Sequence, residues 1–388
     1  MNALLQYLHV AYVFLMGPVP FLIWTSLAKT IGLLCVVLGL VSYTVYAERR
    51  VSSLMQDRLG PNRTGFPTSL LGFKKDWSPF LGGLGQPIAD AVKLLLKEDF
   101  TPKYVKKFYY WIAPGLGIAA AIISLAVIPF GSTLWGVPMV IANIDAGPLF
   151  IFAISSLGVY GIVLAGWSAN SKYPFLGAIR STSQMISYEL AMGLSVVPIF
   201  LLLGKLNLVE IVDYQVKNGW LLAPGLTAMH PRLPYLSEIV LWFPLAISFI
   251  TFMISMFAET NRLPFDLPEA ETELVGGYHT EYSSMKFALF FLGEYAAMIT
   301  GSSLVVVLFL GGWTCPWIPD GSTAWYWGLV NIGVFFAKVI ALLIFFIFIR
   351  WTLPRFRYDQ LMTLGWIWFF EIALVNIFLT AGILAFVH

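Results

Sequence analysis

A high density of carboxylates marks residues 259–281, whose sequence is ETNRLPFDLPEAETELVGGYHTE. The segment holds six of the chain's 21 acidic residues against one strong base, Arg262. The six acids are Glu259, Asp266, Glu269, Glu271, Glu273 and Glu281. Carboxylates that share a partly buried site have raised pKa values and titrate as a coupled set. The segment therefore indicates a cluster that could handle protons or cations.

The same segment also has a simpler interpretation, as an acidic loop in solvent. Pro264 and Pro268 interrupt a helix, and Asp266 could cap a new turn with Pro268 just inside it. Glutamates in that first turn would interact favourably with the positive end of the helix dipole. Glu269 and Glu273 stand four residues apart, however, where like charges repel each other. Composition alone leaves both interpretations open.

Long apolar stretches enclose this segment, and the chain as a whole is 59% hydrophobic and 11% charged. Soluble proteins carry about 25% charged residues, so we predict an all-α polytopic membrane protein. About eight stretches are long enough to span a bilayer. They lie near 22–46, 111–130, 147–167, 184–203, 239–257, 286–310, 325–349 and 365–387. The interrupted apolar stretch 3–23 is interpreted as a partial entry of the first helix, not as a cleaved signal.

Basic residues are distributed unevenly between the two sets of connecting segments. Those after the first, third, fifth and seventh spans contain 18 Lys and Arg, against three in the other set. The positive-inside rule therefore places the first set, with the acidic loop 258–285, on the cytoplasmic side. Both termini are then expected on the outer side of the membrane.

Cysteines and histidines are too few and too scattered to hold a metal centre. Cys35 and Cys315 are far apart, and the four histidines have no partner at helical spacing. No glycine-rich nucleotide motif is present either. We therefore expect no iron–sulfur cluster, metal ion or nucleotide on this chain.

The first cytoplasmic connection, residues 47–110, contains a stretch with helical periodicity at 84–97. Its apolar residues on one side are Leu84, Ile88, Val92, Leu95 and Leu96, and its polar residues on the other are Gln86, Asp90, Lys93 and Lys97. This pattern predicts an amphipathic helix at the membrane surface. Whether its polar face serves as an interfacial anchor or as the lining of a passage stays open.

Four of the ionisable residues inside predicted spans are candidates for a function. Glu189, Glu294 and Glu371 lie in the inner third to half of the membrane, and Lys338 lies near the middle of its span. Such residues are functional candidates because exposing them to lipid is unfavourable. A structural pairing of Lys338 with one of the glutamates is the alternative. The carboxylates could also form one polar chamber with the acidic loop.

Six motifs of the chain resemble those of a known family and occur in the same order. They are AERR, RLGPNRTG, GQPIADAVKLLLKED, GWSANSKYPFLGAIRSTSQMISYEL, AETNRLPFDLPEAETELVGGYHTEYSSMKFALFFLGEY and RWTLPRFRYDQLM. Together they resemble the H subunit of NADH:quinone oxidoreductase, the bacterial respiratory complex I, over roughly residues 30–385. The resemblance implies quinone as substrate, location in the bacterial inner membrane and no redox centre on this chain. Flavin and iron–sulfur clusters would belong to peripheral partner subunits, and small and antiporter-like membrane subunits would complete the assembly.

Site residues follow from the resemblance and not from spacing. No residue would be catalytic on this chain alone. The quinone tunnel would be lined by Glu48, Arg49, Arg58, Asp90, Lys93 and Phe291. The proton path would include Glu189, Glu259, Asp266, Glu269, Glu271, Glu273, Glu281 and Glu294. Lys338 is added to this path as an ionisable residue inside a span, and not from the resemblance. One departure is the connection at 65–84, which is longer than is usual in the family.

Three other functions remain as alternatives at this stage. The chain could be the homologous membrane component of an energy-converting hydrogenase, or of a ferredoxin- or deazaflavin-linked oxidoreductase. It could be a stand-alone ion transporter, although no internal inverted repeat is evident. It could also be a purely structural anchor whose acids dock peripheral subunits.

Overall fold

The computed structural model describes residues 21–62, 64, 83–222, 235–267, 274–315 and 325–387. Within these ranges eight helices are long and apolar enough to cross a membrane. Strand is limited there to one two-residue pairing between β1 (Thr133–Leu134) and β2 (Val137–Pro138). The predicted all-α polytopic fold is therefore confirmed.

The long helices are, in chain order, α2 (Phe21–Met55), α4 (Lys107–Ser124), α5 (Gly147–Ser168), α6 (Lys172–Leu203), α9 (Tyr235–Glu259), α11 (Ser284–Phe309), α12 (Trp325–Thr352) and α14 (Phe370–Val387). The short elements are α3 (Gln86–Leu96), η2 (Leu125–Val127), α7 (Leu208–Asn218), η3 (Gly277–His279) and α13 (Tyr358–Thr363). A π-helical turn, η4 (Leu364–Phe369), joins α13 to α14 into one continuous span.

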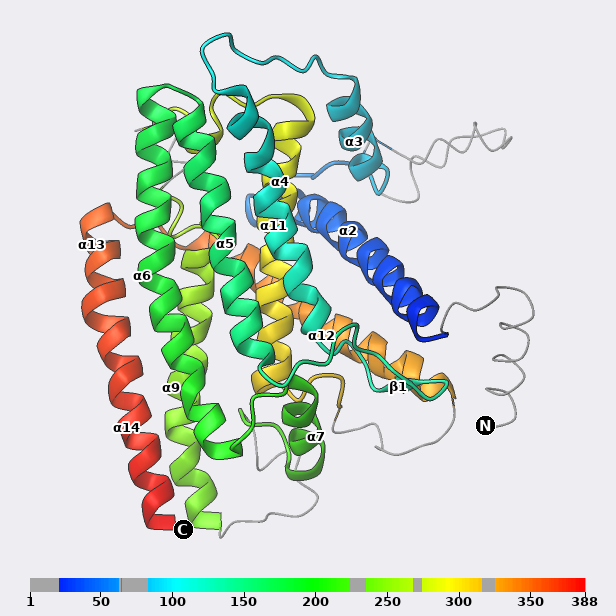
Figure 1. Cartoon of the computed structure of the whole chain (residues 1–388), viewed down its shortest axis with the longest axis vertical. Helices are drawn as coiled ribbons and strands as arrows, with labels where there is room; N and C mark the ends of the chain where they lie inside the picture. Colours follow the sequence, from blue (N-terminus) through cyan, green and yellow to red (C-terminus); the bar gives the residue numbers. More distant parts are fainter. Residues whose placement is uncertain are drawn as a thin grey trace.

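Helix α11 occupies the centre of the bundle, and α2 and α14 lie at its margins. In the most apolar segment of α11, 72% of the residues are buried inside the protein. In the corresponding segments of α2 and of the span that ends in α14, only 17% are buried. Helices α4, α5, α6, α9 and α14 stand nearly parallel, whereas α2 and α12 run obliquely beside α11 (Figure 1). The end where α2 finishes and α11 begins also carries α3, and we name it the α3 end.

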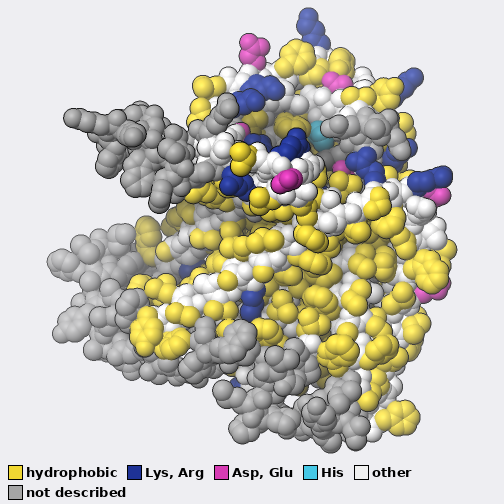
Figure 2. Space-filling model, turned by 180° about the vertical axis from the view of Figure 1, so that it is seen from behind, with side chains coloured by type: hydrophobic (Ala, Val, Ile, Leu, Met, Phe, Trp, Pro, Cys, Tyr) yellow, Lys and Arg dark blue, Asp and Glu magenta, His cyan; other side chains and the backbone are white. Residues whose placement is uncertain are grey.

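The surface has the pattern of a membrane protein. Figure 2 shows hydrophobic side chains over a broad middle belt, with Lys and Arg gathered mainly at the α3 end. Apolar residues all around a helix are expected where its surroundings are lipid or another apolar helix. This distribution agrees with the predicted spans.

Two helices extend well beyond the apolar stretches that predict them. Helix α2 continues to Met55, past the expected end near residue 46, and α6 begins at Lys172, before the expected start near 184. Bilayer thickness fixes how many residues must be apolar, but a helix satisfies its own backbone hydrogen bonds outside the bilayer too. Glu48 and Arg49 therefore lie on rigid helix instead of in a loop.

The amphipathic helix is present as α3, which begins two residues later and ends one residue earlier than predicted. Ser284, the first residue of α11, fixes its C-terminal end by donating to the carbonyl oxygens of Leu94 and Lys97, at 2.9 and 3.0 Å. In this chain the apolar side chains of Ile88 and Leu95 are exposed, by 47% and 64%. Such a face is suited to contact with lipid or a partner subunit.

Close backbone packing joins α6 to η3. A Cβ added at Gly177 would lie 2.9 Å from both the Cα of Gly277 and the backbone nitrogen of Tyr278. Backbone atoms cannot yield as a flexible side chain can. The glycine therefore allows η3 to lie directly against α6, and η3 in turn positions Tyr278 and His279.

We predict that Gly177→Ala destabilises the protein by about 1–3 kcal/mol, because it overpacks this contact. The matched control is Gly193→Ala on the same helix, where a Cβ meets no atom within 4 Å. The control should be neutral or stabilising by up to about 1 kcal/mol, from helix propensity alone. Thermal unfolding in mild detergent, followed by tryptophan fluorescence, measures both. Equal unfolding temperatures for the two variants would contradict the proposed contact.

Candidate functional site

A buried ion pair between Arg262 and Glu294 lies at the centre of the α3 end. Nη2 of Arg262 is 3.1 Å from Oε2 of Glu294, and the two side chains are 4% and 12% exposed. The hydroxyl of Tyr278 donates to Oε1 of the same glutamate at 2.7 Å. Arg262 follows α9, Glu294 is on α11 and Tyr278 is on η3, so the pair holds three elements together.

A second carboxylate, Glu48 of α2, is joined to this pair through Tyr295. The Tyr295 hydroxyl donates to Oε2 of Glu48, and Arg350 of α12 pairs with Oε1. The guanidinium of Arg262 lies over the Tyr295 ring, 4.3 Å from its centroid. Arg262 therefore contacts both Glu294 and the ring that is hydrogen-bonded to Glu48.

Asp266 supplies the third carboxylate. Its Oδ2 accepts from Nη2 of Arg355 at 3.1 Å, and it also interacts electrostatically with Arg350, Glu294 and Arg262. We name these three acids and three arginines, with Tyr278 and Tyr295, the charge network. Its formal charges cancel, as buried ion pairs require if their desolvation is to be offset.

Within the charge network, Asp266 has a raised pKa. Burial raises its pKa to about 6, and the nearby Arg355 opposes that rise. Its Oδ1 has no hydrogen-bond partner among the described residues. Asp266 can therefore gain or lose a proton close to neutral pH.

His279 lies beside the network between aromatic rings. Its ring centroid is 5.2 Å from that of Phe287 and 6.0 Å from that of Phe291. Burial lowers the pKa of His279, and the charge of Glu294 opposes that change. The imidazole is therefore predominantly neutral at physiological pH.

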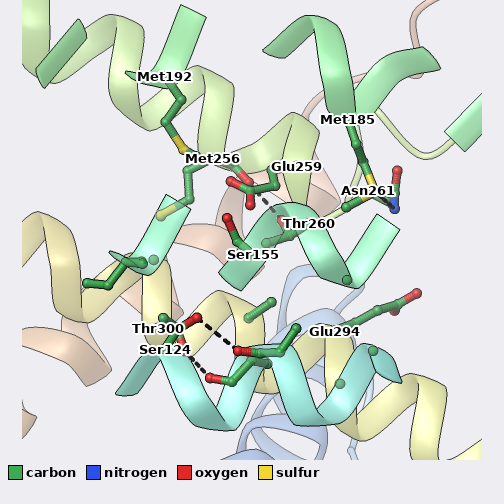
Figure 3. Close-up of a pocket in the computed structure, with 18 of the residues that line it drawn as sticks. Ser124, Ser155, Met185, Met192, Met256, Glu259, Thr260, Asn261, Glu294 and Thr300 are labelled. Atoms are coloured by element: carbon green, nitrogen blue, oxygen red, sulfur yellow. Dashed lines mark hydrogen bonds between the residues drawn. The ribbon is translucent and has the colours of Figure 1, made fainter. Parts of the chain in front are cut away.

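A cavity of about 900 Å³, including its opening, lies between α4, α5, α6, α9 and α11. Tyr278 and Glu294 line it, and so does Glu259 (Figure 3). Glu259 lies beside the Ser155 hydroxyl, with Glu189 close enough for electrostatic interaction. On α11 the lining runs from Phe290 to Leu304, which corresponds to about 21 Å along the helix axis. The cavity therefore extends from the charge network far into the bundle.

Several residues expected at the site are brought together. Glu48, Asp266 and Glu294 belong to the charge network. Glu259 lines the cavity, and Glu189 is close enough to Glu259 for electrostatic interaction. Arg49 and Asp90 form an ion pair at 2.8 Å between α2 and α3. Phe291 lies next to His279.

Other expected site residues lie elsewhere. Nζ of Lys338 donates to the backbone oxygens of Leu310, Gly312 and Thr314 at 2.6–3.0 Å, at the end opposite α3. Glu281 accepts a 2.8 Å hydrogen bond from exposed Tyr104, outside the cavity lining.

The remaining expected site residues are either exposed or outside the described part of the chain. Arg58 contacts Gln56 on the surface, and Lys93 is exposed on α3. Glu371 is exposed on α14 and is not part of the polar chamber that the sequence suggested. The residues Glu269, Glu271 and Glu273 lie outside the described part of the chain, as do Pro268 and most of the long connection at 65–84.

Sequence reasoning did not select the partners of these acids, namely Tyr278, Tyr295, Arg350 and Arg355. Arg262 could be recognised from the sequence, because it is the only strong base in the acidic segment 259–281. Arg350 and Arg355 could be interpreted only as positive-inside residues, because nothing in their spacing indicates that they face α2 or Asp266. Among the described residues no group of three His, Cys, Asp or Glu side chains is arranged to hold a metal ion.

The described part of the chain is a polytopic membrane protein with eight apolar helices that keeps ionisable groups inside its bundle. These groups are the buried arginine–carboxylate pairs and the two glutamates, Glu259 and Glu294, that line part of the cavity. Residues 28–381 match the family model described as NADH dehydrogenase. A relative from Geobacter metallireducens, named as an H subunit of NADH-quinone oxidoreductase, is 46% identical over 373 residues, covering 95% of this chain and 99% of the relative.

Two further relatives, both named as H subunits of the same enzyme, agree with that match. The one from Leptospira biflexa is 47% identical over 351 residues, covering 87% of this chain and 88% of the relative. The one from Rhodospirillum rubrum is 44% identical over 365 residues, covering 93% and 95%. The chain therefore belongs to the H-subunit family of NADH-quinone oxidoreductase, a multi-subunit oxidoreductase, as its motifs indicated.

We predict that the Asp266 carboxyl is protonated below about pH 6 and ionised above it. Infrared difference spectra of wild type minus Asp266→Asn should show a protonated-carboxyl band that disappears as pH rises, with a midpoint near that value. The sign follows from burial, which disfavours the charged form. A midpoint close to the ordinary aspartate value of 3.8 would contradict the prediction.

Proposed function

We propose that this chain lines much of the passage by which quinone reaches the redox centres of partner subunits, and that it couples quinone reduction to proton movement. The observation that carries the proposal is a continuous series of contacts. It runs from Glu48 on α2, through Tyr295 and Arg262, to Glu294 at the cavity. The family membership supplies the substrate, since the relatives are named quinone oxidoreductases.

The quinone side of the proposal rests on α2 and α3. Quinone combines an apolar tail with a polar head, and it needs a path from lipid that ends at polar groups. The exposed apolar residues of α3 suit the tail, and the Arg49–Asp90 ion pair lies on the polar side of the same helix. Arg58, Lys93 and Phe291 extend this proposed lining, and Glu48 stands next to Arg49 in the chain.

Coupling follows from electrostatics in a poorly screened site. Reduction of quinone to quinol takes up two electrons, from NADH through the partner subunits, and two protons. Negative charge that develops near Glu48 strengthens the affinity of neighbouring groups for protons and cations. Because Arg262 contacts both Tyr295 and Glu294, a charge change at Glu48 alters the environment of Glu294. Carboxylates that interact through shared partners are expected to titrate as a coupled set.

The cavity provides a route beyond Glu294. Its polar lining includes Glu259 and the hydroxyls of Ser124, Ser155 and Thr300 (Figure 3). Most of the cavity lining is apolar, and these few polar groups are where water molecules could be held by hydrogen bonds. Protons could then pass between Glu294, Glu259 and Glu189. By family resemblance Glu269, Glu271 and Glu273 would join this path from the acidic loop.

The proposed orientation places the α3 end in the cytoplasm of a bacterial cell and both termini outside, with the inner membrane as location. The concentration of Lys and Arg at the α3 end supports this orientation (Figure 2). Peripheral partners that carry flavin and iron–sulfur clusters would dock at that end. The hydrogenase-type alternative has no support from these three relatives, each of which is named as an H subunit of NADH-quinone oxidoreductase.

We predict that Glu259→Gln lowers quinone reduction and proton pumping together by about tenfold or more, because it removes a proton-accepting group from the cavity. Both activities are measured on the complete complex in proteoliposomes, and native gels report its assembly. The matched control is Glu210→Gln. Glu210 is an exposed acid on α7, and it is paired with Lys205, which precedes that helix. Wild-type pumping in the Glu259 variant would contradict the proposed path.

A further inference from the structure

Glu371 is an ionisable residue that neither the charge network nor the cavity includes. It is exposed on α14, surrounded on the same outward face by Trp368, Val375 and Phe378, which are 58%, 60% and 70% exposed. No basic side chain of the described residues forms an ion pair with it. This carboxylate therefore stands alone on an apolar face of the bundle.

The position along the helix places Glu371 inside the apolar part of the span. It lies six residues into the apolar stretch 365–387 and sixteen residues before Val387. At the helical rise these separations are about 9 Å and 24 Å. The residue is therefore in the inner half of the membrane, within the apolar layer. A charged carboxylate that faces lipid in this layer is unfavourable.

Packing of the opposite face prevents α14 from rotating to bury Glu371. Ala373, Asn376 and Thr380 are almost fully buried, at 0%, 2% and 1% exposure. Nδ2 of Asn376 donates to the carbonyl oxygen of Pro244 and to the Ser248 hydroxyl, both at 2.9 Å. These bonds fix the helix against α9, with Glu371 directed outward.

The π-helical turn η4, just before α14, also determines the direction in which Glu371 points. Such a turn contains one additional residue, so the residues after it are rotated by about 100° relative to an uninterrupted α-helix. Gly365 in this turn packs closely on Tyr188 and Ser187 of α6. The direction of Glu371 is thus built into the fold at two places.

We propose that the outward face of α14 is an interface, covered in the assembled complex by a transmembrane segment of another subunit that presents a Lys or Arg side chain to Glu371. Charge complementarity selects this occupant over lipid tails, which offer no partner to a carboxylate. The exposed aromatic and aliphatic residues around Glu371 would form the apolar surroundings of a buried ion pair. The inference rests on membership of a multi-subunit complex and not on the proposed proton path.

The first test maps the neighbour directly. A photo-cross-linking amino acid replaces Val375 in the intact complex, one helical turn from Glu371 on the same face. The expected product is an adduct with a different subunit, at a peptide that contains a Lys or Arg within its membrane span. Adducts with lipid only, or with a second copy of this chain, would overturn the proposal.

Charge reversal then tests the ion pair. Glu371→Lys should lower the yield of intact complex by about tenfold or more, since it opposes two like charges in the membrane. Reversing the mapped basic residue to Glu should restore assembly in the double variant, which a misfolded chain would not allow. Asp359→Lys is the control, because Asp359 is an exposed acid near the start of the same span. Normal assembly of Glu371→Lys, or no rescue by the reciprocal change, would contradict the pair.

Discussion

The structure depends most on one buried cation, the guanidinium of Arg262. With 4% of its surface exposed, it can stay charged only because Glu294 neutralises it and the Tyr295 ring lies against it. Removing one partner of such a pair leaves an uncompensated buried charge, at a cost of about 3–5 kcal/mol. Helices α2, α11 and α12 and the segment after α9 must all converge to complete this arrangement. The network thus dictates how the α3 end is assembled, and the rest of the bundle supports it.

The proposed function depends on the same buried charges. A charge-balanced network inside a poorly polarisable bundle responds strongly to a nearby change of charge, which water would otherwise screen. The rigid extension of α2 beyond the bilayer places Glu48 next to the proposed quinone passage, and α11 carries Glu294 to the cavity. Asp266, with its raised pKa, provides a group that can exchange a proton near physiological pH. In the proposed function, quinone binding and proton movement are linked through these contacts between side chains.

Much of the fold was predictable because the bilayer imposes a simple rule on sequence, namely long apolar runs. Individual site residues were also recognisable, since Glu294 and Asp266 are acids in or beside such runs. Their partners were not, because the pairing of Glu48 with Arg350 joins two residues that are 302 positions apart in the chain. Nor could the sequence orient Glu371, since α14 is apolar on all sides and has no periodicity to distinguish its faces. Lys338 shows the same limit, as its backbone partners at the end of α11 depend on tertiary packing.

The central claim is that Arg262 links the quinone side of the network to the cavity. Its most direct test is Arg262→Gln in the complete complex, with proton pumping and quinone reduction measured in proteoliposomes. Reduction of a water-soluble electron acceptor by the peripheral subunits reports that the assembly is intact, and Arg357→Gln, at an exposed arginine, is the control. The account predicts that pumping and quinone reduction fall together while reduction of the soluble acceptor is retained. Normal pumping in an assembled Arg262→Gln complex would contradict it.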